Sequence, residues 1–169
     1  MKMRDLLLLE ARIKEEVENL ERLKKSLKDR GFWSTTSKTK LRHSDEFTLR
    51  ALASVLLDYY TAVENIFEQI AKTVDGSLPS GQEWHKDLLL QMKLEINGIR
   101  PAVISQETFT YLDEYRKFRH LVRNIYGFNL IPERLEPLLA RLPQVDQRFR
   151  EEIEAFTKQM YDIISQDSY

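Results

Sequence analysis

Six apolar residues in the first half of the chain constrain the fold most strongly. They follow one another at alternating steps of four and three residues: Leu52, Leu56, Tyr59, Val63, Ile66 and Ile70. In a helix of 3.6 residues per turn this spacing places all six side chains on one side, as in a helix that packs lengthwise on another. The segment that starts at Ser44, a good N-cap residue, and ends near Asp75 is therefore predicted to form a long helix with a helical partner.

The same periodicity recurs along the chain. It predicts helices at about 3–30, 82–96 and 106–126, and Ser105 is the expected N-cap of the third. A short helix is expected to begin at Pro132, and a break at Pro143 is expected to separate it from the last helix. No segment alternates with period two, and Gly and Pro number only five each. We expect an all-α, antiparallel bundle of about five main helices, one domain over residues 1–169. The predicted core residues are Leu52, Leu56, Val63, Ile66, Phe118, Val122, Ile125, Ile153 and Phe156.

Composition excludes several classes of function. Lys and Arg total 26 against 27 Asp and Glu, so any nucleic-acid site must be a local patch on a chain that is nearly neutral. The chain has no Cys, which excludes disulfides, a Cys nucleophile and Cys-based metal sites. The aliphatic run at 6–9 is too short for a signal peptide or a membrane span. These features favour a cytoplasmic protein.

One helix carries an unusual row of cations. At ~100° per residue, Arg116, Arg119, His120, Arg123 and Asn124 share one side of the helix predicted at 106–126, opposite its apolar side chains. Like charges three or four residues apart destabilise a helix by a few tenths of a kcal/mol per pair. Arg offers planar donors to phosphate, and His exchanges protons near neutral pH. The row indicates an anion site, although a solvated face, or pairing with acids of the last helix, explains it as well: Glu151, Glu152 and Glu154.

Other chemical signatures are weak. The sequence has no Gly-rich phosphate loop and no His-Glu-x-x-His motif, and its three His residues lack metal-ligand spacing, so we expect no metal and no cofactor. Glu64 is most simply a residue of a helix surface. Trp84 and His85 open a helix, where a capping or interface role is the simplest interpretation and stacking on a base is the functional alternative.

The segment FRHLVRNIYGFNL, at 118–130, resembles the HEPN superfamily, specifically the HepT-like toxins. The motif of that family is Arg-x4–6-His, often seen as Arg-Asn-x3-His-x-Tyr; Arg119 matches its Arg and Tyr126 its Tyr. Further likeness lies in YYTAVENIFEQIAKTVDG at 59–76, LPSGQEWHKDLLLQM at 78–92 and RPAVIS at 100–105.

The resemblance implies a function. HepT-like toxins are helical, metal-independent endoribonucleases that form homodimers, with a composite cleft between the two motif helices. They need no cofactor and are neutralised by an MNT-type nucleotidyltransferase antitoxin, which in some systems adenylylates the motif Tyr, here Tyr126. The resemblance thus predicts a homodimer, this antitoxin as partner, and RNA such as tRNA as substrate.

The sequence departs from the motif at one position. The position of the family's His is Asn124, and the position of its Asn is His120. In an active nuclease, Arg119 with Arg116 or Arg123 stabilises the phosphate charge, and His120 transfers the proton. Asn124 then orients the phosphate or the imidazole, and Tyr126 binds RNA or is modified. The alternative is a catalytically silent HEPN module that binds the nucleotidyltransferase, since an amide transfers no proton. Because these residues share a polar face, we expect their substitution to change stability little.

Overall fold

The computed structural model describes residues 1–34, 38–123 and 130–166. These residues form six α-helices, and a π-helical turn, η1 (Ala71–Asp75), continues the third. They contain no strand, only an isolated bridge between Ile96 and Arg100. The prediction of an all-α helical bundle is confirmed. The helices are α1 (Met3–Asp29), α2 (Lys38–Arg42), α3 (Glu46–Ile70), α4 (Trp84–Met92), α5 (Gln106–Arg123) and α6 (Pro132–Gln166).

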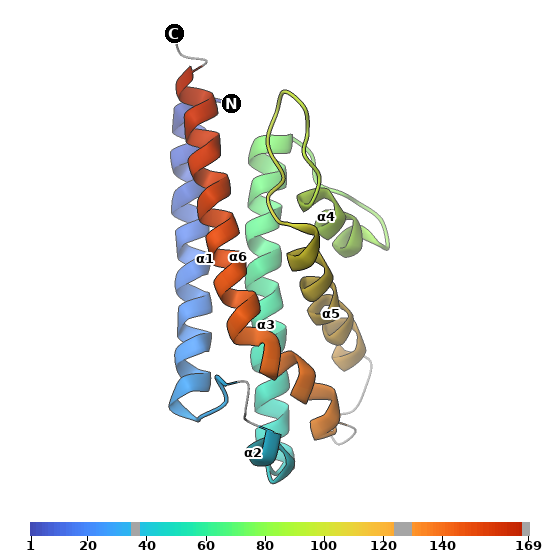
Figure 1. Ribbon diagram of the computed structural model, residues 1–169. Helices are drawn as coiled ribbons and strands as arrows, with labels where there is room; N and C mark the ends of the chain where they lie inside the picture. The colour runs from blue at the N-terminus through green and yellow to red at the C-terminus, as the bar shows by residue number, and fades with distance from the viewer. Residues whose placement is uncertain (35–37, 124–129, 167–169) are drawn as a thin grey trace.

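Helix α3 is the centre of the bundle. It contacts α1, α4, α5 and α6, and Figure 1 shows α1 and α5 running antiparallel to it. Its apolar row is buried as predicted, including Leu52, Val63 and Ile66. The other predicted core residues are also buried, except that Val122 is half-buried against the core and Ile125 lies outside the described residues.

Local caps set where two of the helices begin. Asp45, not Ser44, is the N-cap of α3, and its carboxylate accepts a hydrogen bond of 2.8 Å from the Thr48 N–H. Hydrogen bonds from Thr48 hold the pKa of Asp45 below its usual value. Ser105 precedes α5 as predicted, and its hydroxyl accepts from the Thr108 N–H at 3.2 Å. Both bonds satisfy a first-turn N–H that lacks a helical partner.

The predicted break at Pro143 is wrong. Helix α6 continues through Pro137 and Pro143, although each Pro removes one helical hydrogen bond. An interior Pro costs about 3 kcal/mol, but each large apolar side chain that becomes buried contributes about 1.5–3 kcal/mol. The buried row of α6 has members on both sides of Pro143, Leu142 and Val145 among them. Packing therefore outweighs the local preference.

The connection between α4 and α5 is fixed by a buried guanidinium. The side chain of Arg100 is 0% exposed and forms a bidentate pair with Asp75, Nε to Oδ1 at 2.5 Å and Nη2 to Oδ2 at 2.9 Å. It also donates to the backbone carbonyls of Gln91, Leu94 and Pro101. One side chain thus joins the end of η1 to the C-terminal end of α4 and the chain that leads into α5.

We predict that Arg100→Ala lowers the free energy of unfolding by about 3–5 kcal/mol, because it leaves the buried Asp75 carboxylate without its cation, with only the hydrogen bond from Gln91 remaining. Urea unfolding followed by circular dichroism measures the change. The matched control is Arg50→Ala, which removes an exposed ion pair with Glu46 on α3 and is expected to cost less than about 1 kcal/mol. Equal losses in the two variants would contradict this role of Arg100.

Candidate functional site

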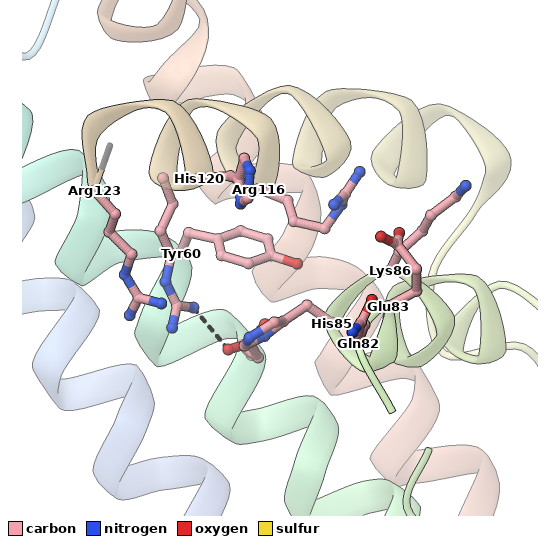
Figure 2. Close-up of a pocket in the computed structure, with 10 residues that line it drawn as sticks. Tyr60, Gln82, Glu83, His85, Lys86, Arg116, His120 and Arg123 are labelled. Carbon is pink, nitrogen blue, oxygen red and sulfur yellow. Dashed lines mark hydrogen bonds and ion pairs between the residues drawn. The ribbon is translucent and has the colours of Figure 1, made fainter. Parts of the chain in front are cut away.

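A polar pocket lies where α3, α5 and the start of α4 meet. Figure 2 shows Arg116, His120 and Arg123 on α5, across the pocket from His85 of α4. Its empty volume, which includes solvent at the mouth, is about 500 Å³. The pocket is lined by Tyr60, Glu64, Gln82, Glu83, His85, Lys86, Arg116, Arg119, His120 and Arg123.

The floor of the pocket is a buried carboxylate. The side chain of Glu64 is only 5% exposed. Its Oε1 accepts from Nη1 of Arg119 at 2.7 Å, and its Oε2 lies 2.7 Å from Nδ1 of His85. A buried carboxylate is stable only when it is paired and hydrogen-bonded. Glu64 of α3 therefore links His85 of α4 to Arg119 of α5.

His85 is oriented by two neighbours. An ionised carboxylate only accepts hydrogen bonds, so the 2.7 Å contact with Glu64 requires Nδ1 of His85 to carry the proton. The indole of Trp84 stacks on the imidazole, with ring centroids 3.7 Å apart and an interplanar angle of 30°. The side chain is 31% exposed. His85 is thereby held in one tautomer, with Nε2 as the ring nitrogen left for a ligand.

Arg116 is held by an acid of its own helix, α5. Nε of Arg116 donates to Asp113 at 2.7 Å. Burial raises the pKa of Asp113, but hydrogen bonds from Lys117 and Arg116 outweigh this and hold that pKa below its usual value. Asp113 is thus a fixed negative charge that positions Arg116.

Tyr60 closes the pocket beside Arg119. The guanidinium of Arg119 lies over the Tyr60 ring, with Cζ 5.9 Å from the centroid. Burial, followed by the charge of Glu64, raises the pKa of Tyr60 far above its usual value. The phenol therefore stays neutral and acts only in hydrogen bonding and packing.

The structure brings four of the predicted site residues into this one pocket: Arg116, Arg119, His120 and Arg123. Asn124 and Tyr126 lie outside the described residues. Arg119 does not pair with an acid of the last helix, because its partner is Glu64 of α3. Glu152 of the last helix instead accepts a hydrogen bond from the Ser105 N–H.

Sequence reasoning missed two residues of the site. Glu64, expected on a helix surface, is buried, and His85 lies on the wall of the pocket. The sequence does contain one indication that Glu64 is paired. It lies next to the apolar row at Val63 and Ile66, and a carboxylate buried beside such a row needs a partner. Nothing in the sequence indicates that this partner is Arg119, which lies 55 residues away.

Comparison with protein families supplies the identity of the fold. The sequence model of the HepT-like protein family matches residues 51–160. The chain is a member of the HepT-like family. Every residue that lines the pocket of this HepT-like protein falls within the matched segment. Comparisons with curated proteins and with solved structures give no match.

Metal-binding clusters and membrane-spanning helices are absent from the described part of this HepT-like protein. Among residues 1–34, 38–123 and 130–166, no group of three or more His, Asp or Glu side chains is arranged to hold a metal ion. None of the helices within those ranges is both long enough and apolar enough to cross a membrane.

The burial of Arg119 corrects the expectation that substitutions on this face leave stability unchanged. The Arg119 side chain is 11% exposed. We predict that Arg119→Ala lowers the free energy of unfolding by about 3–5 kcal/mol, because Glu64 loses its cation. Adding Glu64→Ala should cost less than the sum of the two single changes, with a coupling energy of about 0.5–3 kcal/mol.

Urea unfolding of the wild type, both single variants and the double variant measures this coupling. Arg123→Ala is the control on the same helix; Arg123 is exposed, and its removal should change stability by no more than about 0.5 kcal/mol. Strict additivity of Arg119→Ala and Glu64→Ala would show that the pair is energetically unimportant.

Proposed function

We propose that this HepT-like protein is a metal-independent endoribonuclease, the toxin of a toxin–antitoxin pair, and that the pocket binds the phosphodiester to be cleaved. The observation that carries the proposal is the convergence of three Arg guanidiniums and two imidazoles on one pocket within the family's matched segment. Guanidiniums bind phosphate oxygens through paired hydrogen bonds, and imidazoles transfer protons near neutral pH.

The charges of the pocket suit a phosphodiester. Its lining has four cationic side chains, Lys86 and the three arginines, against two carboxylates. Glu64 and Asp113 hold Arg119 and Arg116 in place before any ligand arrives. Cations that are already oriented stabilise developing charge without reorganisation during the reaction. The pocket therefore favours the additional negative charge of a phosphate in its transition state.

The proposed reaction is attack of a ribose 2′-OH on the adjacent phosphodiester. Arg119, with Arg116 or Arg123, stabilises the charge on the phosphate oxygens, and His120 takes part in proton transfer. Asn124 orients the phosphate or the imidazole. Tyr126 binds RNA or is the target of adenylylation.

The protein is further proposed to act in the cytoplasm as a homodimer whose partner is an MNT-type nucleotidyltransferase antitoxin. In the dimer, the polar faces of the two helices at 106–126 border one RNA cleft. The exposure of His120, Leu121 and Arg123 near the end of α5 supports this, because a second protomer or RNA can reach them.

A second candidate function is a silent module that binds the nucleotidyltransferase. The observation in its favour is Asn124, an amide at the position of the family's His. In that case the basic row docks on an acidic surface of the partner. The two functions differ in whether the purified protein cleaves RNA.

We predict that the purified protein cleaves total tRNA in the presence of a chelator, and that Arg119→Lys lowers the rate by about a hundredfold or more. Lys retains a cation beside Glu64, so the fold is preserved while the planar donor pair is lost. The control is Arg141→Ala, which removes an exposed pair between α6 and α5 and should leave cleavage unchanged.

The result decides between the candidate functions. Full activity of a folded Arg119→Lys variant, or loss of wild-type activity with chelator, would overturn the proposed mechanism. If the wild type is silent and Asn124→His creates cleavage, the protein is the silent module.

The dimer is tested separately. We expect sedimentation velocity to show a species of twice the 20.1 kDa chain mass at tens of micromolar protein. A charge reversal at the exposed end of α5, Arg123→Glu, should shift it toward monomer, whereas Arg50→Glu on an exposed part of α3 should not. A wild-type monomer at that concentration would contradict the composite cleft.

A further inference from the structure

Cleavage of a phosphodiester by a 2′-OH requires two proton transfers. One group must take the proton of the attacking hydroxyl, and another must give a proton to the departing 5′-oxygen. The family's motif supplies an imidazole at a position that is Asn124 in this chain, and an amide performs neither transfer. A second proton-transfer group must therefore come from elsewhere in the pocket.

We propose that His85, held by Glu64, is the general base of this pocket and that His120 is its general acid. The proposal rests on the nuclease function proposed above and names the groups that perform its two proton transfers. His85 and His120 line the same pocket from opposite sides, His85 from α4 and His120 from α5, as Figure 2 shows.

The geometry of His85 is that of an oriented base. Glu64 accepts from Nδ1 at 2.7 Å and Trp84 stacks on the ring, so the position and the tautomer of the imidazole are both fixed. In the neutral ring, Nε2 is then the nitrogen without a proton and is able to accept one. A buried carboxylate on Nδ1 also stabilises the imidazolium that forms once Nε2 has taken that proton.

Charged groups of both signs surround His85. Its neighbours in the pocket include both cations and carboxylates. The closest of all is Glu64, in direct contact with Nδ1. Burial keeps the Tyr60 phenol neutral, so it does not compete as a base. The titratable and charged groups that line the pocket with His85 are Tyr60 and Glu64 from α3, Arg116, Arg119, His120 and Arg123 from α5, and Glu83 and Lys86 next to it in the chain.

The step balances without a further reactant. The 2′-O–H proton passes to Nε2 of His85 as the bond from 2′-O to phosphorus forms. The bond from phosphorus to the 5′-oxygen breaks, and that oxygen takes a proton from protonated His120. The products are a 2′,3′-cyclic phosphate and a 5′-hydroxyl, and the two imidazoles exchange protonation states.

Glu64 is a positioning residue for both the proposed phosphate ligand and the proposed base. One of its oxygens holds Arg119, the proposed phosphate ligand, and the other holds His85, the proposed base. The distance between the phosphate and the base is therefore set by a single carboxylate. Its removal should impair the chemical step more than RNA binding.

The test uses the full chain and four variants with tRNA as the first substrate. His85→Gln retains an N–H that can donate to Glu64, which preserves the fold, but it cannot transfer a proton. We expect His85→Gln and His120→Ala each to lower the cleavage rate by about 100- to 10,000-fold. His43→Ala, a change at an exposed His outside the pocket, should cleave like the wild type. Circular dichroism confirms the fold of each variant.

A second substrate separates the two roles. Once the cleavage site is mapped, an oligoribonucleotide with sulfur in place of the 5′-bridging oxygen at that site provides a leaving group that departs without a proton. His120→Ala should recover most of its activity on this substrate, whereas His85→Gln should remain impaired. Glu64→Gln should lower kcat more than it changes KM and move the acidic limb of the pH–rate profile to lower pH, because the imidazolium loses its carboxylate.

Each remaining outcome overturns a definite statement. A folded His85→Gln variant that cleaves tRNA like His43→Ala overturns the assignment of His85 but leaves the nuclease function intact. Recovery of His85→Gln, rather than His120→Ala, on the sulfur substrate overturns the assignment of the base. A wild type that cleaves no tRNA overturns the proposed function, and this assignment with it.

Discussion

The carboxylate of Glu64 is the interaction on which the pocket depends. It is buried on the central helix α3, where a lone charge is strongly unfavourable, and it is stabilised by Arg119 of α5 and His85 of α4. The same contacts that satisfy the carboxylate orient a cation and an imidazole toward the pocket. Stability and the proposed chemistry thus share one set of hydrogen bonds, so a substitution at Glu64 affects both.

The fold was predictable because its information is local. The row of apolar residues on α3, the cap at Ser105 and the start of α6 at Pro132 each depend on residues within a few positions of one another. The break predicted at Pro143 failed because the local preference of Pro is overridden by burial against other helices. The short helix α2 was missed as well, since five residues show no periodicity.

The site residues on α5 were predictable from local sequence, and those on α3 and α4 were not. Arg116, Arg119, His120 and Arg123 lie within two turns of one helix, so the spacing alone places them together. Glu64 and His85 come from other helices, and their contacts join residues 55 and 21 positions apart in the chain. No periodicity encodes such contacts. These contacts form because α4 packs against α3 and α5, and the Arg100–Asp75 pair helps to hold α4 in that position.

The continuity of α6 has a consequence for conformational entropy. The helix contacts α2 and α5 as well as α1, and Figure 1 shows its first turns directed toward α5 and its later turns alongside α1. Each residue of this long helix loses about 1–2 kcal/mol of backbone entropy at 25 °C when it is fixed on folding. Pro137 and Pro143 lose less, because their φ angles are already restricted in the unfolded chain. The two Pro residues that weaken the helix locally therefore also reduce the number of conformations open to the unfolded chain.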